Sequence, residues 1–397
     1  MYQIKSQTVV DAIESDCRTF RAVLEFHDTS YSGSDVGKIT IEHAQSEDDT
    51  IQIGGVLSRH AEIRLHTRRI PSKGAQFDLY LYLLDWGGAP TDVSTYKALK
   101  QWLHGELAAY THAQIRLLGK YKDGDGVPLD GLLIPMGEYL TSKVQIRGGE
   151  VTLECYDRLG TDKVYTPGIA FPADSWEVVE DVISQLGIRG RKAASGGYLK
   201  TASGQYVLTA SGKMVLTSAE YSFTIDTAPP NGTTCRCILG WIAAMYGGNG
   251  ILDRNGMYTT MFANSGSVVL KNSRINEPEL SETEIQIRGI RCTVGENNVL
   301  EVLRSQEVDP EDSLIVEFDC PYMTQERLDA IWRRLRQLKW RPGNVTERMG
   351  DPRHDLGDRL GVSTSNGRAT LIASSVTFRF DGGLQAEHES CGNTEEG

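Results

Sequence analysis

The strongest constraint on the fold is a set of short segments in which apolar and polar residues alternate with a period of two. In the first part of the chain they lie at 39–41, 63–65, 77–83, 144–146 and 151–155. Such alternation puts one side of a strand against a core and the other toward solvent, and glycine turns between strands favour antiparallel pairing. Closure into a barrel removes the exposed edges of such a sheet. We therefore expect residues 1–163 to form an antiparallel β-barrel with the shape of a tube wall.

One segment of this first region has helical periodicity instead. Tyr96, Leu99, Leu103 and Leu107 recur three or four residues apart, which places them on one face of a helix from about 94 to 107. We expect this helix to cover or plug the barrel.

Residues 164–278 read as a mixed α/β domain. Asp174 and Glu177 have the spacing of a capping box, and an apolar stripe follows until Gly187. A second helix is expected to begin near Thr234 and to end at Gly247-Gly248, with a hairpin turn at 253–256. A small sheet packed on two helices satisfies this pattern.

An octapeptide repeat lies inside this domain. Thr201-Ala202-Ser203-Gly204 recurs as Thr209-Ala210-Ser211-Gly212, so that residues 198–219 form strands between Ser-Gly turns. A meander this small is not stable as an independent folding unit. We interpret it as a surface hairpin insertion, with a contact arm for a neighbouring protein as the alternative.

A second tube-like antiparallel barrel is expected from residues 279–319 together with 356–389, because alternation returns at 285–290, 314–318 and 376–380. Residues 320–355 interrupt it as an inserted helical or α/β domain, whose helix begins at Thr324. Residues 390–397 are expected to be a disordered tail. The chain is thus predicted to be α+β and mainly β, with two barrels and two smaller α/β domains.

Four arginines lie on the helix that begins at Thr324 and are the only residues that we single out as candidates for binding. They are Arg327, Arg333, Arg334 and Arg336. A solvated helix face is one interpretation, since charged runs usually are solvated. The other is a subunit interface, where arginine is enriched.

The charge of the chain argues against static binding of nucleic acid. The formal net charge is −12 over 397 residues, without any basic cluster, whereas phosphate neutralisation dominates that affinity. A negative surface would suit a wall past which DNA slides, but ordinary solubility explains such a charge equally well.

Cysteine usage and the N-terminus indicate where the protein is made. The seven cysteines are scattered without a C-x-x-C pair, which is typical of reduced thiols in a cytoplasm. The start of the chain has no signal-peptide pattern, and no apolar run is long enough to span a membrane.

Motifs for covalent chemistry are not found in the sequence. The eight histidines form no H-E-x-x-H motif, the loop at 122–126 does not complete a calcium loop, and no nucleophile elbow occurs. Residues 351–355 mix acids and a base, which could suggest a nuclease. A loop that leads into a strand explains them better, although carboxylate pairs brought together in space stay open. We expect no enzyme activity, no catalytic residue, no bound metal and no cofactor.

Several motifs resemble one protein family. They are Cys320-Pro321-Tyr322-Met323-Thr324, Arg341-Pro342, Gly350-Asp351-Pro352, Leu356-Gly357-Asp358 and Phe380-Asp381-Gly382-Gly383-Leu384, with a second patch at 235–256 and a weaker one at 137–159. Their order along the chain resembles that of the central hub proteins of phage tails and phage-like contractile particles. These proteins lie at the tail tip and are related to the base of type VI secretion spikes.

The resemblance implies a structural role in the virion, at the tail tip or baseplate, after assembly in the host bacterial cytoplasm. Such hubs are homotrimers in which each subunit gives two similar barrels to a ring. The ring joins the hexameric tail tube to a spike or tip protein and lines the channel for DNA or tube. Expected partners are the tube protein, distal tail or baseplate proteins, the spike and the tape measure protein. DNA would meet the chain only in transit.

Two other functions stay open at this stage. A cell-wall hydrolase of the tail tip would clear peptidoglycan. A distal tail or receptor-binding module would bind host carbohydrate or cell surface and would carry more aromatic residues in its loops.

Overall fold

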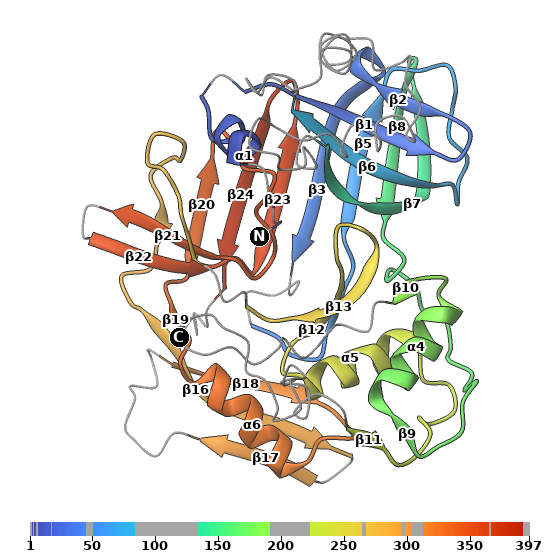
Figure 1. Cartoon of the computed structure of the whole chain (residues 1–397), viewed down its shortest axis with the longest axis vertical. Helices are drawn as coiled ribbons and strands as arrows, with labels where there is room; N and C mark the ends of the chain where they lie inside the picture. Colours follow the sequence, from blue (N-terminus) through green and yellow to red (C-terminus); the bar gives the residue numbers. More distant parts are fainter. Residues whose placement is uncertain are drawn as a thin grey trace, which may run out of the picture.

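The computed structural model describes residues 2, 4, 7–16, 18–44, 51–83, 133–190, 223–263, 267–295, 298–303, 313–364 and 367–391. Figure 1 shows a large β region in the upper part of the molecule and two α/β units below it. The chain is mainly β with a few helices, as the sequence predicts.

One antiparallel sheet of eleven strands forms the upper part, in the order β15-β20-β24-β23-β3-β5-β8-β7-β6-β1-β2. Its N-terminal strands are β1 (Phe20–Phe26), β2 (Ser30–Ser32), β3 (Val36–Ala44), β5 (His60–Leu65), β6 (Gln76–Leu83), β7 (Leu133–Arg147) and β8 (Glu150–Tyr156). Its C-terminal strands are β15 (Glu279–Leu280), β20 (Gly343–Glu347), β23 (Ser375–Phe380) and β24 (Leu384–Ser390). The two ends of the chain therefore build one sheet.

The two groups of strands meet where β3 pairs with β23, a contact that we call the seam. The strands are antiparallel and in register from Ser375 opposite Ala44 to Phe380 opposite Ile39. Ile41 and Phe378 are partners in the middle of the seam, and both are buried. A single hydrophobic core continues beneath both groups of strands.

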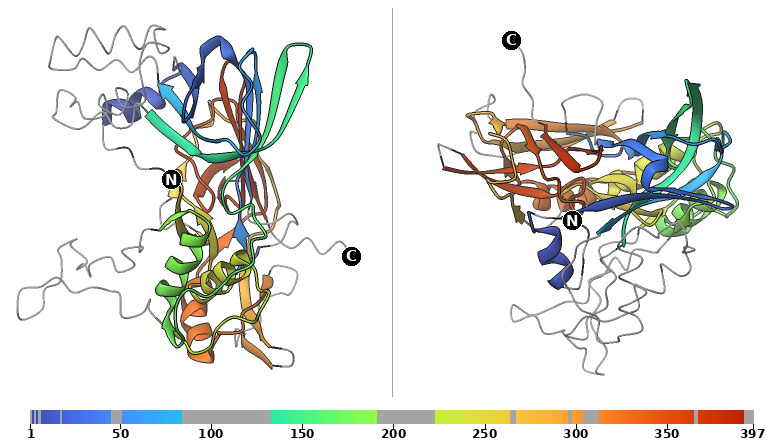
Figure 2. Two further views of the ribbon diagram at one scale, coloured as in Figure 1. Left: turned by 90° about the vertical axis from the view of Figure 1, so that its right-hand side faces the viewer. Right: turned by 90° about the horizontal axis from the view of Figure 1, so that it is seen from above.

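The hairpin of β7 and β8 leans away from the sheet, as the second view of the molecule shows (Figure 2). Arg147 lies opposite Glu150, so that Gly148 and Gly149 are the two turn residues. Their φ angles are +58° and +91°. Glycine adopts this left-handed conformation without a steric penalty, which is why Gly-Gly supports a two-residue turn.

A smaller sheet covers part of the C-terminal strands. It consists of β14 (Ser267–Val269), β21 (Arg359–Thr364) and β22 (Gly367–Ile372). Leu360, Val362 and Leu371 from this sheet share the core with Val376 and Ala386 of the large one. This part of the chain is therefore two layers of strands around apolar side chains.

The first α/β unit contains the helices α4 (Ser175–Gln185) and α5 (Cys235–Met245), which pack on a small mixed sheet. Its strands are β4 (Val56–Leu57), β10 (Arg189–Gly190), β12 (Asn249–Leu252) and β13 (Met257–Met261), beside a pair of β9 (Ala173–Asp174) and β11 (Thr224–Ile225). The capping box of Asp174 and Glu177 begins α4, and the hydroxyl of Thr234 caps α5. The predicted hairpin turn at 253–256 joins β12 to β13.

The second α/β unit packs α6 (Gln325–Leu335) on β16 (Ile285–Val294), β17 (Asn298–Leu303) and β18 (Ser313–Asp319). The short strand β19 (Lys339–Trp340) pairs with β16. β16 and β17 form a hairpin, whereas β18 runs parallel to β16 on its other side. The helix begins at its cap Thr324, as predicted, and buries Leu328, Ile331 and Leu335.

The strand positions agree with the sequence, but the pairing differs from the predicted division. Strands of 285–319 pair with one another and not with those of 375–390, while β20, from the predicted insertion 320–355, joins the large sheet. Alternation specifies which face of a strand is buried and says nothing about its neighbour. The prediction of two separate barrels therefore did not foresee a continuous sheet across the seam.

Three predicted features lie outside the described residues. They are the covering helix at 94–107, the octapeptide repeat at 198–219 and the tail beyond residue 391. The six cysteines within the described ranges have free thiols. In those same ranges, no helix has the length and hydrophobicity that a membrane span requires.

The seam makes a testable prediction. Replacing Phe378 with alanine should lower the free energy of unfolding by about 3 kcal/mol, because a buried aromatic side chain is lost. Hydrogen exchange should become faster in β3 as well as in β23. Phe318→Ala, which removes an equally buried ring from the second α/β unit, should leave exchange in β3 unchanged. Unchanged exchange in β3 of the Phe378→Ala variant would contradict the role of the seam.

Candidate functional site

The loop between β20 and β21, residues 348–358, carries an unusual number of buried polar side chains. Asp351, Arg353, His354 and Asp358 are each no more than 6% exposed. The loop turns on its own side chains, because Asp351 accepts from the backbone of Arg353 and Asp358 accepts from that of Asp355. Charged groups are rarely buried unless they are paired. We call the loop and its partners the polar junction.

Arg254 ties the first α/β unit to this loop. It projects from the β12–β13 turn, and its Nε donates to Oδ2 of Asp355 over 2.9 Å. Its other nitrogens donate to the carbonyl oxygens of Pro352 and His354. Arg59 lies on the other side of the same carboxylate, with Nη2 at 3.6 Å from Oδ1. The Asp355 carboxylate therefore has a guanidinium on each side.

The N-terminal segment is held by the same loop. Nη2 of Arg353 lies 2.6 Å from Oδ2 of Asp351 and 2.9 Å from Oε1 of Glu14, which follows α1 (Gln7–Ile13). Arg18 donates to the carbonyl oxygens of Gly350 and Ile13. The amide of Tyr2 donates to the carbonyl of Arg353 over 2.7 Å. The junction thus joins the N-terminus, the seam strands and an α/β unit.

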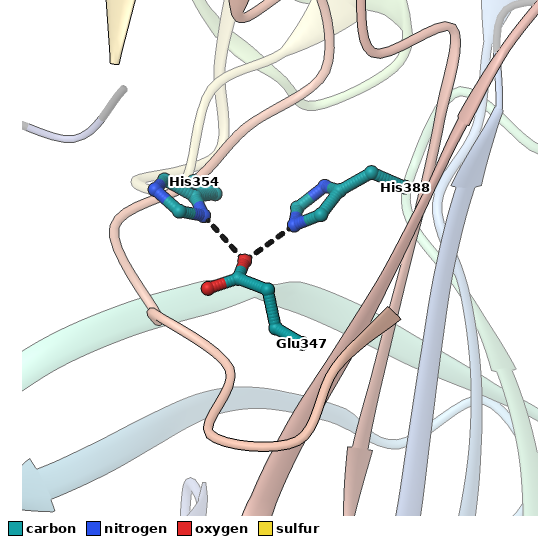
Figure 3. Close-up of side chains that lie close together, drawn as sticks. All are labelled: Glu347, His354 and His388. Atoms are coloured by element: carbon teal, nitrogen blue, oxygen red, sulfur yellow. Dashed lines mark hydrogen bonds and ion pairs between the residues drawn. The ribbon is translucent and has the colours of Figure 1, made fainter. Parts of the chain in front are cut away.

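A compact cluster of two histidines and one glutamate lies beside the loop (Figure 3). Oε1 of Glu347 is 2.7 Å from Nδ1 of His354 and 2.6 Å from Nε2 of His388. The three side chains are between 1% and 3% exposed. The second ring nitrogen of each histidine is buried without a hydrogen-bond partner within the described part of the chain.

Charge pairing controls the protonation of these groups. Burial alone would raise the pKa of Glu347, but the two histidines outweigh it and lower that pKa. For Asp351, burial is likewise outweighed by the hydrogen bonds and charge of Arg353, which lower its pKa. Burial would lower the pKa of His354, but the neighbouring Glu347 raises it. The junction therefore favours charged carboxylates in the folded protein.

The charged groups of the junction act as a structural clasp: they pair with one another and hold separate parts of the chain together. Its acids and bases face one another inside the protein, and each described carboxylate of the loop binds a cation or a backbone amide. A small hollow under the seam is lined by apolar residues, together with His43, Arg59, Arg254 and Asp355. Among the described residues, a metal could be held by Glu347, His354 and His388, whose ligand atoms lie within 4.8 Å of one another.

The four arginines predicted as an interface have different surroundings. Nε of Arg327 donates to the carbonyl of Met245 over 2.8 Å, and its guanidinium lies over the rings of Phe223 and Tyr246. Arg334 donates to the carbonyls of Tyr246 and Gly247 at the end of α5. These two therefore bind to another part of the chain, whereas Nε of Arg333 donates within α6 to the carbonyl of Asp329. Arg333 on α6 and Arg336, which directly follows it, are exposed, and an interface there stays a prediction.

Sequence reasoning identified residues 351–355 as a loop before a strand, which the structure confirms, but it missed the cluster. The sequence did contain an indication of the cluster, because polar side chains occupy inward-facing positions of two strands. Glu347 shares the buried face of β20 with Val345, and His388 shares that of β24 with Leu384 and Ala386. A charged or imidazole side chain at an inward position needs a partner. The pairing of β20 with β24, which alternation cannot supply, brings them together.

No family model and no curated protein sequence matches the chain. Solved structures do match it. A tail protein from Neisseria meningitidis MC58 has a TM-score of 0.49 at 9% identity, with 94% of this chain and 97% of that chain covered. The 43 kDa tail protein of prophage MuSo2 from Shewanella oneidensis gives 0.46 at 12% identity, covering 93% and 96%. A chain of the phage P2 baseplate gives 0.28 at 8% identity, covering 94% and 100%.

Arg254 should be essential for the stability of the junction. Arg254→Met should lower the free energy of unfolding by about 3 kcal/mol, because it leaves the Asp355 carboxylate and two carbonyls short of a donor. Arg379→Met removes a half-exposed ion pair with Glu387 and should cost less than about 1 kcal/mol. Urea unfolding measures both. Equal losses would contradict the pairing described for Arg254.

The junction should also make stability depend on pH. Burial would raise the pKa of Asp355, but the charges of Arg254 and Arg59 outweigh it and lower that pKa. The contribution of this carboxylate is present above its ordinary pKa of about 4 and is lost as pH falls through the folded value. Asp355→Asn should therefore flatten the loss of stability as pH falls below about 5.

Urea unfolding at several pH values measures this effect. Asp28→Asn, which changes a carboxylate that is 90% exposed, is the control and should follow the wild-type curve. A steep loss retained in Asp355→Asn would show that other groups govern the acid response.

Proposed function

We propose that this chain is a structural component of a phage or phage-like tail, and within it the central hub of the baseplate. In this role it forms a homotrimer that joins the hexameric tail tube to the central spike or tip protein and lines the channel. The distal tail, baseplate and tape measure proteins are further proposed partners. The protein would assemble in the host cytoplasm and reside in the virion at the tail tip.

The observation that carries the proposal is the seam. Strands from the two ends of the chain form one antiparallel sheet of eleven strands with a continuous core. Backbone pairing across the whole sheet gives a stiff wall, which suits a protein that transmits load and shape between neighbours. The buried charged groups below the seam are paired with one another in the manner of a structural clasp.

The two groups of strands offer a way to match threefold with sixfold symmetry. On one side of the seam lie β3, β5, β8, β7, β6, β1 and β2, and on the other lie β23, β24, β20 and β15. We propose that each side supplies one barrel-like wall. Three chains would then present six walls to a sixfold tube, which reconciles threefold with sixfold symmetry. The interfaces should be obligate, burying on the order of 2,000 Å² or more per pair of chains.

The motifs behind the family resemblance have structural tasks here. Gly350-Asp351-Pro352 and Leu356-Gly357-Asp358 lie in the loop of the polar junction. A Cβ atom at Gly350 would lie 2.6 Å from the backbone nitrogen of Ala386, so only glycine lets the loop approach β24. The Asp381-Gly382-Gly383 segment turns β23 into β24. These residues maintain the seam and the loop, which is what a structural role requires of them.

The two α/β units lie together at one end of the large sheet (Figure 1). We propose that they face outward from the ring and contact baseplate neighbours. Arg333 on α6 and Arg336 at its C-terminal end are the proposed interface residues, because both side chains are exposed, whereas Arg327 and Arg334 bind the backbone at the end of α5.

Light scattering tests the assembly. The purified chain should have the mass of three copies, either alone or after addition of tube protein, and Arg333→Glu with Arg336→Glu should weaken association with baseplate neighbours. Arg68→Glu with Arg69→Glu, which makes the same change of charge at two exposed arginines between β5 and β6, serves as the charge-matched control. A stable monomer in the presence of tube protein would contradict the hub.

Two assays separate the hub from the other functions. A peptidoglycan zymogram should show no clearing, and binding to host cells should be absent. Clearing would favour a tail-tip hydrolase, and cell binding would favour a receptor-binding module.

A further inference from the structure

Three potential metal ligands converge from three separate segments of the chain. Glu347 ends β20, His354 lies in the loop 348–358 and His388 lies in β24. Figure 3 shows both imidazole rings directed at the same oxygen of the Glu347 carboxylate. The three groups are buried, so that water and surface ions do not compete for them.

Hydrogen bonds within the cluster use one nitrogen of each ring. One carboxylate oxygen of Glu347 forms a hydrogen bond with a nitrogen of each ring. Nε2 of His354 and Nδ1 of His388 have no partner among the described residues. The nitrogens that face Glu347 are therefore the ones that converge with its carboxylate, and neither ring has a second hydrogen bond among the described residues that would have to break when a metal binds. Two neutral imidazoles and one carboxylate form a donor set that divalent transition metals bind well.

We propose that Glu347, His354 and His388 bind one divalent transition-metal ion, and that zinc is the ion of choice. Zinc bonds to imidazole nitrogen and carboxylate oxygen are about 2.0–2.2 Å long, so ligand atoms must lie roughly 3.3 Å apart in a tetrahedron. The two contacts of Glu347, now 2.7 and 2.6 Å, would widen by roughly 0.6 to 0.7 Å on binding, a change that side-chain rotation can supply. This inference does not depend on the proposed function.

The ion would act as a structural clasp. It would cross-link the end of β20, the middle of β24 and the loop that holds the N-terminal segment. The carboxylate of Glu347 would neutralise part of its charge, and Asp351 lies close enough to interact with the ring of His354. Metal binding adds its free energy to folding, since the three ligands are brought together only in the folded chain.

Metal content tests the proposal directly. The full-length chain is treated with chelator, dialysed and incubated with zinc or cobalt. Bound metal is then measured by elemental mass spectrometry. We expect about one zinc per wild-type chain. Zinc at a hundredfold excess over its dissociation constant should raise the melting temperature by about 3 °C. Cobalt bound in place of zinc should show the visible absorption that is typical of a cobalt ion with nitrogen and oxygen ligands.

The variants are chosen to keep the hydrogen bonds. His354→Asn and His388→Gln retain an amide near the nitrogen that faces Glu347, and Glu347→Gln retains the side-chain shape. Each should lose most of the bound zinc and the zinc-dependent rise in melting temperature. His43→Gln is the matched control, because it removes another buried histidine, which contacts Arg59 and not the cluster. It should bind zinc like the wild type.

The possible results distinguish a failure of the metal site from a failure of the proposed function. Folded wild-type protein that takes up no stoichiometric metal overturns the site, and so does equal uptake by wild type and all three ligand variants. If a ligand variant fails to fold, the metal content and cobalt spectrum of the wild type still decide. A trimer without zinc would leave the proposed function standing, and a monomer with zinc would leave the site standing.

Discussion

The pairing of β3 with β23 is the interaction on which the rest of the structure depends. It joins strands from opposite ends of the chain, so that residues 36–44 and 375–380 are neighbours in one sheet. Closing so long a chain segment costs conformational entropy, which local hydrogen bonds alone would not offset. The shared core beneath the seam supplies the compensating burial. The N-terminal and C-terminal β regions are therefore expected to fold and unfold as one unit.

The polar junction fixes the seam to the other parts of the molecule. Arg254 reaches it from the first α/β unit, and Arg353 connects it to Glu14 near the N-terminus. Ion pairs in such a setting specify geometry more than they add stability, because desolvation offsets much of their attraction. Their value here is in holding one loop against three elements. A single arrangement of the chain is what the proposed symmetric assembly would require of its subunits.

Local features of the fold were predictable and the pairing was not. Asp174 with Glu177 and Thr234 mark helix starts because capping acts between residues close in sequence, and the structure confirms both. Alternation located the strands for the same reason. It could not show that β16 would pair with β18 in parallel, since partners are chosen by packing over long distances. The cluster was missed because Glu347 and His388 meet only through the β20–β24 pairing.

A reconstruction of the intact tail tip by electron cryomicroscopy tests the central claim most directly. The account predicts three copies of this chain around the tube axis, each placing two adjacent β-walls, one from either side of the seam, against the channel. Six copies with one wall each would contradict it. So would a tail tip in which the large sheet faces away from the channel, or one from which the chain is absent.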